Sequence, residues 1–154
     1  MPVRTFLSRS ASFKKPNVPQ YTNDPKTIGE HIRKKRIQSN CAQKELADKL
    51  GVSENTINAW ELGHTNPSTH YYPAIIAYLG YYPFEHETES CAGKLKQIRH
   101  CKGLTFEQCA TLFSISEDAA MRWEKGKTIA NETYKERIRF VWSELPEHLV
   151  QHPL

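Results

Sequence analysis

One pattern occurs twice along the chain, and it limits the fold to an arrangement of two related units. Shifting the 154-residue sequence by 63 positions aligns residues 28–63 with residues 91–126 without a gap, and seven of the 36 aligned positions are identical. The identical pairs are Arg36/Arg99, Ala47/Ala110, Ser53/Ser116, Glu54/Glu117, Trp60/Trp123, Glu61/Glu124 and Gly63/Gly126. Because the matches fall on apolar and turn positions, they indicate duplication of one helical unit. We therefore predict an arm at residues 1–26, a first domain at 27–84 and a second domain at 85–154.

Apolar spacing predicts that the first unit consists of short helices. These helices are expected at residues 28–38, 43–50, 54–62 and 70–79, each with apolar side chains on one face. Gly51 suits a left-handed turn after the second helix, and Ser53 suits the N-cap of the third. A helix over residues 131–145 is expected to close the second unit, and Pro146 and Pro153 predict an irregular tail after it.

Composition and the cysteines restrict the cellular setting and the chemistry. No run approaches the ~18 apolar residues that a membrane helix requires. The first fifteen residues contain no continuous apolar stretch of the kind that a secretory signal needs. The cysteines at positions 41, 91, 101 and 109 form no Cys-x-x-Cys pair, which argues against a zinc site. We therefore expect a soluble, cytoplasmic chain with reduced thiols, no membrane contact, no metal and no cofactor.

The positive charge of the chain is concentrated in residues 1–26. The whole chain has a formal net charge of +4. The charged side chains of the N-terminal segment are Arg4, Arg9, Lys14, Lys15 and Lys26 against Asp24. Its prolines and its lack of helical or strand periodicity predict a flexible basic arm, which suits a polyanionic partner. Its serine and arginine content also fits an organellar transit peptide, and that alternative stays open.

Residues 43–63 combine two short helices with a glycine turn, which is the arrangement of a helix-turn-helix. The run QKELADKLGVSENTINAWELG, followed by Pro67, resembles the lambda-repressor-like (Cro/XRE-type) DNA-binding domain. The resemblance covers residues 27–84 strongly and residues 91–127 weakly. It implies an all-α fold of two tandem lambda-repressor-like helix-turn-helix bundles with a basic N-terminal arm. It also implies a transcriptional regulator of bacterial or phage type, a repressor that binds double-stranded DNA in the nucleoid.

The resemblance assigns roles to individual residues. Gln43 would bind a phosphate, while Asn55 and Asn58 would read base edges in the major groove. The expected DNA contacts are Gln43, Lys44, Ser53, Glu54, Asn55, Thr56, Asn58, Ala59, His64, Thr65 and Asn66, with Arg4, Arg9, Lys14 and Lys15 from the arm. Arg36 and Glu61 match an ion pair of the family. The pair recurs as Arg99 and Glu124, and we interpret both pairs as structural.

The second copy keeps the expected scaffold but changes the face that would meet DNA. At five positions that align with expected DNA contacts of the first copy, the second copy carries the chemically different residues Phe106, Glu107, Asp118, Ala119 and Met121. Glu117 and Asp118, side by side, would oppose the approach of phosphates. We therefore hypothesise that the first copy binds DNA, while the second stabilises the chain, forms a homodimer or recruits a protein partner.

Two further groups of residues have structural interpretations. Cys41 aligns with Leu104, and Cys109 aligns with Leu46, so both cysteines are interpreted as small core residues. The aromatic residues between positions 71 and 84 are interpreted as core and inter-unit packing, and a dimer face is the functional alternative.

The sequence shows no arrangement of catalytic side chains. No Ser/His/Asp group, carboxylate pair or phosphate-binding loop stands out, so we expect that the chain is not an enzyme. The alternative to a DNA-binding regulator is a protein-interaction adaptor, which the balanced charge of residues 27–154 favours. An antitoxin that represses its own gene and a recombination accessory factor share the same domain and differ in partner.

Overall fold

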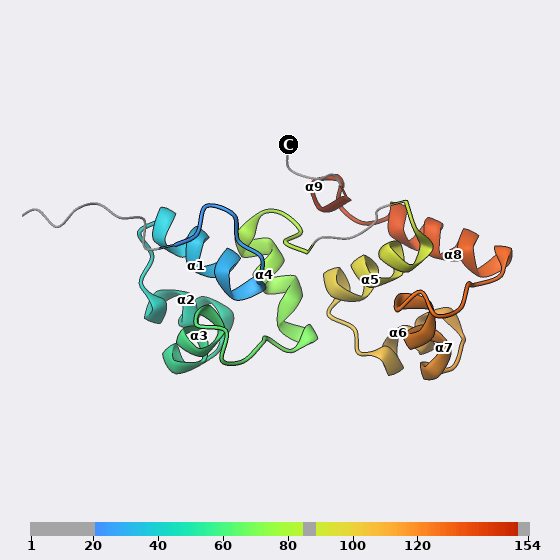
Figure 1. The fold of residues 1–154 in the computed structure, drawn as a ribbon, viewed down its shortest axis with the longest axis horizontal. Helices are drawn as coiled ribbons and strands as arrows, with labels where there is room; N and C mark the ends of the chain where they lie inside the picture. The colour runs from blue at the N-terminus through green and yellow to red at the C-terminus, as the bar shows by residue number, and fades with distance from the viewer. Residues whose placement is uncertain (1–20, 85–88, 151–154) are drawn as a thin grey trace, which may run out of the picture.

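The computed structural model describes residues 21–84 and 89–150, and the regular structure in these ranges is helical (Figure 1). The elements are α1 (Ile28–Gln38), α2 (Gln43–Leu50), α3 (Glu54–Glu61), the 3-10 turn η1 (Thr69–Tyr71), α4 (Tyr72–Leu79), α5 (Cys91–Lys102), α6 (Phe106–Phe113), α7 (Glu117–Glu124), α8 (Glu132–Ser143) and α9 (Glu147–Val150). The predicted all-α class is confirmed. None of the described helices is long and apolar enough to cross a lipid bilayer.

Helices α1–α4 form a unit that we call the N-terminal bundle, residues 21–84. Helix α2 packs against α3, and α1 packs against both α3 and α4. Their shared core contains Ile28, Ile32, Leu46, Ala47, Leu50, Ile57, Trp60, Ile75 and Leu79. Most of these are the apolar positions whose spacing predicts the helices. Burial of one face of each helix therefore holds the bundle together.

Local hydrogen bonds fix where these helices begin and end. The hydroxyl of Thr27 accepts from the Glu30 N–H at 3.2 Å, while the Glu30 carboxylate accepts from the Thr27 N–H at 3.0 Å, which completes a capping box. Gly51 ends α2 with φ at 68°, a conformation that glycine adopts without strain. Ser53 then caps α3 by accepting from the Thr56 N–H at 3.1 Å. The glycine turn and the serine cap confirm the predicted ends.

Helices α5–α9 form a second unit that we call the C-terminal bundle, residues 89–150. Helix α6 packs against α7, and α5 packs against both α7 and α8. These pairings follow the same order as those of α1–α4. The core contains Leu95, Ile98, Cys109, Phe113, Ile138 and Leu145. The helix predicted over residues 131–145 is present as α8.

The segment after α8 differs from the prediction. Residues 147–150 form the short helix α9, although Pro146 predicts an irregular tail. The Leu149 N–H bonds to the Pro146 carbonyl at 2.9 Å, and Val150 packs against the C-terminal core. Proline is compatible with the start of a helix, and burial of one apolar side chain stabilises a turn that is too short to show periodicity. The prediction is therefore wrong for residues 147–150, while Pro153 lies outside the described residues.

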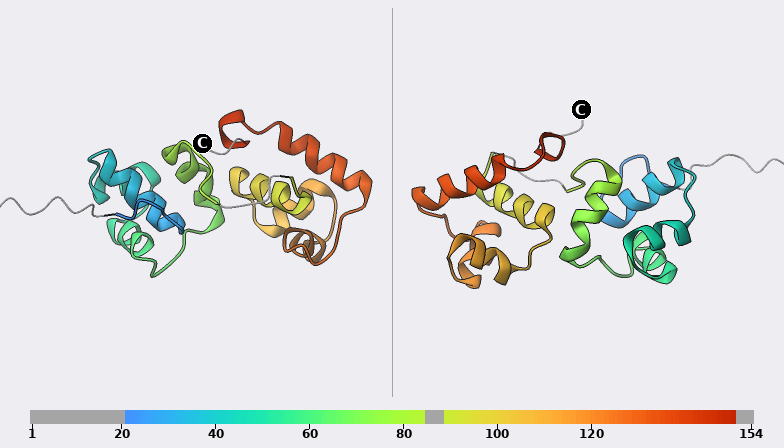
Figure 2. Two further views of the ribbon diagram at one scale, coloured as in Figure 1. Left: turned by 45° about the horizontal axis from the view of Figure 1, so that its top comes forward. Right: turned by 180° about the vertical axis from the view of Figure 1, so that it is seen from behind.

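The two bundles meet where α4 packs against α5 (Figure 2). The Tyr82 hydroxyl lies 2.9 Å from Nδ1 of the buried His100. The rings of Phe84 and Tyr72 lie against the same imidazole, with centroid distances of 4.6 and 4.8 Å. Aromatic side chains between positions 71 and 84 thus pack within and between the bundles, as their structural interpretation predicts.

Candidate nucleic-acid interface

The helix-turn-helix of the N-terminal bundle is built from α2, the turn at Gly51 and α3. Leu46 and Leu50 on α2 are buried against Ile57 and Trp60 on α3. These contacts fix the angle between the two helices. Because α3 has only eight residues, its position depends on this packing more than on its own helical stability.

The outer face of α3 is polar and exposed. Glu54, Asn55 and Asn58 are exposed, and Thr56 and Ala59 are half-buried beside them. The loop of His64, Thr65 and Asn66 is exposed directly after α3, and Lys44 is exposed on α2. The structure therefore places these predicted contact residues on the surface, where a partner can reach them. Arg4, Arg9, Lys14 and Lys15 lie outside the described residues.

Gln43 has a role that the sequence does not reveal. Its Nε2 donates to Glu61 Oε2 at 2.8 Å and lies 3.5 Å from Oδ1 of Asn58. Gln43 therefore connects the start of α2 to two residues of α3. The amide nitrogen carries two hydrogens, and these two contacts account for both of them. In the second copy the aligned residue is Phe106, which has no hydrogen-bonding side chain. The alignment therefore indicates that this contact is confined to the first copy.

Arg36 and Glu61 form the predicted ion pair between α1 and α3. The guanidinium donates from Nε and Nη2 to the two carboxylate oxygens at 2.6 and 2.8 Å, and Nη1 donates to the carbonyl of Cys41 at 3.0 Å. The two side chains are only 15% and 2% exposed. The hydrogen bonds to Glu61 raise the pKa of Arg36 against the effect of burial. The pair therefore holds α3 against α1.

The C-terminal bundle contains the second predicted pair, Arg99 with Glu124. Nε and Nη2 donate to the two carboxylate oxygens at 2.6 and 2.7 Å, and Nη1 also donates to Oγ1 of Thr69 in the N-terminal bundle at 3.3 Å. The ring of Phe106 lies 4.2 Å from the guanidinium. Burial by itself would lower the pKa of Arg99, but the hydrogen bonds and charge of Glu124 raise it.

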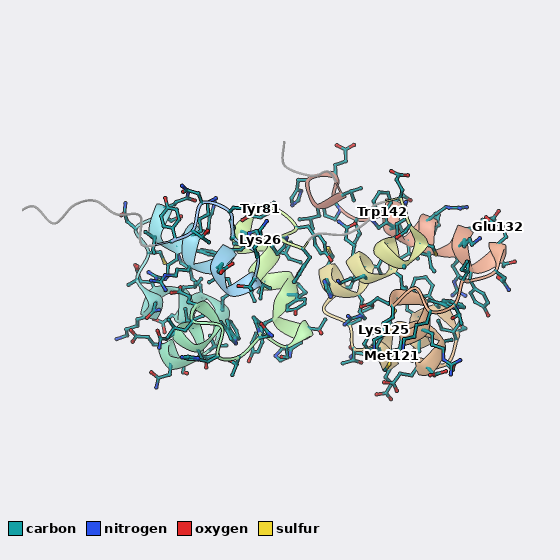
Figure 3. All side chains as sticks on the ribbon, viewed as in Figure 1. Lys26, Tyr81, Met121, Lys125, Glu132 and Trp142 are labelled. Carbon is teal, nitrogen blue, oxygen red and sulfur yellow. The ribbon has the colours of Figure 1, made fainter. Side chains whose placement is uncertain are left out.

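The outer face of α7 differs from that of α3. Glu117 and Asp118 are exposed at its start, and Asp118 pairs with Arg122 at 2.9 Å. Figure 3 shows Met121 on this helix and Lys125 directly after it, at the edge of the molecule on which α3 also lies. The basic charge of Arg122 is therefore already partnered by an acid of its own helix.

The cysteines are all free thiols in the structure. Cys109 is buried in the C-terminal core, and burial raises the pKa of its thiol to about 11. Cys41 packs against the N-terminal core, so both cysteines have the structural place that was predicted for them. Within residues 21–84 and 89–150, no group of three His, Cys, Asp or Glu side chains could hold a metal ion.

The geometry of α1–α4 defines a helix-turn-helix domain, and comparison with known proteins agrees. Residues 32–86 match the model of a family described as helix-turn-helix, and this stretch is a domain of the Cro/XRE type. Over 57 residues, or 35% of this chain, the sequence is 46% identical to the Type II methyltransferase M1.ScrFI of Lactococcus lactis subsp. cremoris. The chain spans 15% of the length of that relative. No solved structure matches the chain.

Proposed function

We propose that this protein binds double-stranded DNA in a sequence-specific way by placing α3 in the major groove, and that it regulates transcription as a repressor. The observation that carries the proposal is the polar outer face of α3, on which Asn55 and Asn58 are exposed while the Arg36–Glu61 pair holds the helix against α1. A helix fits the major groove, and an asparagine amide can form two hydrogen bonds with adenine. The match to a helix-turn-helix family supports this assignment.

Contacts with phosphates would position α3 on the duplex. The start of α2, at Gln43 and Lys44, would bind one phosphate, and the loop of residues 64–66 would bind another. Glu54 would accept a hydrogen bond from a cytosine amino group, and Ala59 would pack on a thymine methyl group. Ser53 and Thr56 would contact the backbone or base edges.

The C-terminal bundle is, in this proposal, a degenerate second copy of the same domain. Its helices pair in the same order as α1–α4, and Arg99 with Glu124 reproduces the buried ion pair. The acidic start of α7, at Glu117 and Asp118, opposes binding to phosphates. The second copy would therefore stabilise the first and offer a surface to another chain, with no base reading of its own.

The proposal includes the setting in which the protein acts. It would bind DNA in the cytoplasm of a bacterium, encoded by the bacterium or by a phage, and it would have no catalytic activity and no cofactor of its own. The bacterial source of the methyltransferase relative supports this setting.

The decisive experiment is selection of the purified chain on random duplex DNA at near-physiological salt. We expect an enriched sequence motif, and we expect that Asn55→Ala abolishes or alters it. Each bidentate base contact is worth about 1–3 kcal/mol of discrimination against a wrong base. The matched control is Asp118→Ala at the aligned position of α7, which should leave the motif unchanged.

The outcomes separate the proposal from its alternative. Loss of the motif in Asn55→Ala with retention in Asp118→Ala assigns base reading to α3. Equal loss in both variants would contradict the division of roles between the copies. An absence of any enriched motif would reject sequence-specific binding and favour the adaptor.

The basic arm gives a second prediction for DNA binding. Removal of residues 1–20 takes away Arg4, Arg9, Lys14 and Lys15 and should weaken binding. Each lost phosphate contact reduces the slope of log K against log salt by about 0.9, so the slope should fall by a few units. Binding titrations between 50 and 200 mM salt, about the range in which such effects are large, measure this change. An unchanged slope would show that the arm does not contact DNA.

A protein-interaction function has one specific observation in its favour. Ile129 and Phe140 in the C-terminal bundle are 82% and 65% exposed, which is high for large apolar side chains. In this second candidate function, residues 85–154 would bind a protein partner or a second copy of the chain. Replacing both residues by serine should then prevent association without changing the affinity for DNA.

A further inference from the structure

A groove lies beside α1 in the N-terminal bundle, at the side on which the chain continues to the C-terminal bundle. It encloses about 1130 Å³ and is lined by residues 23–26, by α1, by residues 79–84 and by Lys96 of α5. Figure 3 shows two of its lining residues, Lys26 and Tyr81, at the edge of the bundle opposite α3. The volume is sufficient for a small ligand, since typical ligand pockets measure about 300–1,000 Å³.

The groove has a large excess of positive charge. Lys34 and Lys35 line it from α1, and Lys96 lines it from α5. Asp24 is the one carboxylate among the lining residues, and it pairs with Lys26 at 2.7 Å. Neither Lys35 nor Lys96 has an ion-pair partner in the described part of the chain. Lys34, Lys35 and Lys96 thus line the groove from two helices, and Asp24 alone does not balance their charge, which creates a positive potential inside the groove.

One wall of the groove is aromatic and held in place. The Tyr81 hydroxyl bonds to Nδ1 of His31 at 2.7 Å, and the two rings meet edge to face at 5.6 Å. Burial, with a smaller effect of the Lys34 charge, lowers the pKa of His31, so the ring is neutral at neutral pH. Lys34 is itself anchored, because its Nζ donates to the carbonyl of Asn23 at 2.6 Å. The wall is thus organised before any ligand binds.

We propose that this groove binds a nucleoside polyphosphate, with Lys34, Lys35 and Lys96 around the phosphates and the ring of Tyr81 against the base. Ammonium groups form strong, charge-assisted hydrogen bonds with phosphate oxygens, and an ammonium that already donates once keeps two further donors. An aromatic wall adds favourable contact with a flat ring. The lysines and the aromatic wall together favour a ligand that has both phosphate groups and a flat ring.

The position of the groove favours a small ligand over a second DNA contact. Figure 1 shows α1 toward the upper edge of the N-terminal bundle and α3 toward its lower edge, so DNA bound at α3 would lie on the far side of the bundle from α1. The ligand would contact α1 and α5 at once, because Lys35 and Lys96 come from different bundles. A ligand that binds the folded state alone raises the melting temperature with its concentration. Binding of the nucleotide itself does not require that DNA is bound.

The test is calorimetric titration of the full chain with ATP, with GTP and with inorganic tripolyphosphate at near-physiological salt. We expect saturable binding of at least one nucleotide, at least tenfold tighter than tripolyphosphate. The variant Lys35→Ala/Lys96→Ala should weaken that binding at least tenfold. The matched control, Lys49→Ala/Lys125→Ala, removes two exposed lysines outside the groove and should bind the nucleotide like the wild type. Circular dichroism confirms that each variant is folded.

A second variant separates the two parts of the site. Tyr81→Leu should reduce nucleotide affinity toward that of tripolyphosphate, while leaving tripolyphosphate binding unchanged. The proposal is overturned if no nucleotide binds, if tripolyphosphate binds as tightly as the nucleotides, or if both lysine double variants weaken binding equally. It is also overturned if duplex DNA displaces the nucleotide from a chain that carries Asn55→Ala, since the groove would then be a DNA surface.

Discussion

At the residue scale, the two buried ion pairs are enclosed in different ways. In the N-terminal bundle the amide of Gln43 donates to Glu61 beside Arg36. In the C-terminal bundle the ring of Phe106, at the aligned position, covers the guanidinium of Arg99. The first arrangement keeps a hydrogen-bond donor at the surface of α2, and the second replaces it with an apolar contact. The start of the helix thus presents an amide beside the ion pair in the first bundle and an aromatic ring in the second.

The Arg36–Glu61 pair leads to a prediction about stability. Glu61→Ala leaves the largely buried guanidinium of Arg36 without its carboxylate, so the free energy of unfolding should fall by about 3–5 kcal/mol. Urea denaturation followed by circular dichroism measures the change. Asp48→Ala is the control, because Asp48 is an exposed carboxylate on α2, and it should change the free energy by less than about 0.5 kcal/mol. A midpoint shared by the two variants would show that the pair is not stabilising.

The sequence predicts these ion pairs but not which other side chains contact them. Their partners can be assigned through the family resemblance and the 63-residue repeat, because both positions carry Arg and Glu. The bond from Gln43 to Glu61 depends on side-chain torsions that are set only when α2 and α3 pack. For the same reason, the resemblance predicts a phosphate contact for Gln43 but does not predict that Gln43 links two helices.

At the element scale, the contact between α1 and α3 requires a glycine. A Cβ placed on Gly29 would lie 1.9 Å from the carbonyl oxygen of Trp60, so α1 and α3 approach closely at this point. The aligned residue of α5 is Ala92, which already has a Cβ. The corresponding contact in the C-terminal bundle therefore has a different spacing, although the helices pair in the same order.

This close approach predicts a large effect of a small substitution. Gly29→Ala should force α1 away from α3 and lower the free energy of unfolding by about 1–3 kcal/mol or more, despite the better helix propensity of alanine. The reverse change at the aligned site, Ala92→Gly, should cost only about 0.5–1 kcal/mol from helix propensity. Denaturation curves of the two variants give the comparison. An increase in stability for Gly29→Ala would mean that the helices have room for a Cβ.

Helix boundaries are the part of the fold that local chemistry predicts best. The starts of α3 and α6 follow a serine and a threonine, Ser53 and Thr105, whose hydroxyls accept from the N–H three residues later. Helix α9 was not predictable in this way, since four residues are too few for a periodic pattern. Its stability comes from contacts of Leu149 and Val150 with the C-terminal bundle, which only the folded chain provides.

At the scale of the whole molecule, α4 of the N-terminal bundle also packs against the C-terminal bundle. Ile75 and Leu79 lie in the N-terminal core, while Ile76 is fully buried but outside both core clusters. Since α4 also packs against α5, Ile76 is expected at the contact between the bundles. Such a contact is assembled from residues far apart in the sequence. The sequence therefore predicts aromatic packing between the units but not which helices meet.

The packing of α4 against α5 predicts that the bundles unfold together. Ile76→Glu places a charge at the contact and should make the C-terminal bundle exchange its amide hydrogens independently of α1–α3. In the wild type, both bundles should exchange with similar protection. Hydrogen exchange followed peptide by peptide by mass spectrometry distinguishes the two cases. Ala77→Glu, at an exposed position of α4, is the control and should behave like the wild type.

The joint between the bundles has a direction. The last helix of the N-terminal bundle meets the first helix of the C-terminal bundle, whereas a two-fold contact would present the same helix from both sides. Because the two contacting surfaces belong to different helices, the contact has no two-fold symmetry. Each bundle therefore uses a different surface to contact the other. Helix α5 must remain complementary to α4, but α1 has no preceding helix of this kind among the described residues. The sequences of the two bundles are therefore subject to different packing requirements. Reversing the order of the bundles in the chain would require new contact surfaces on both.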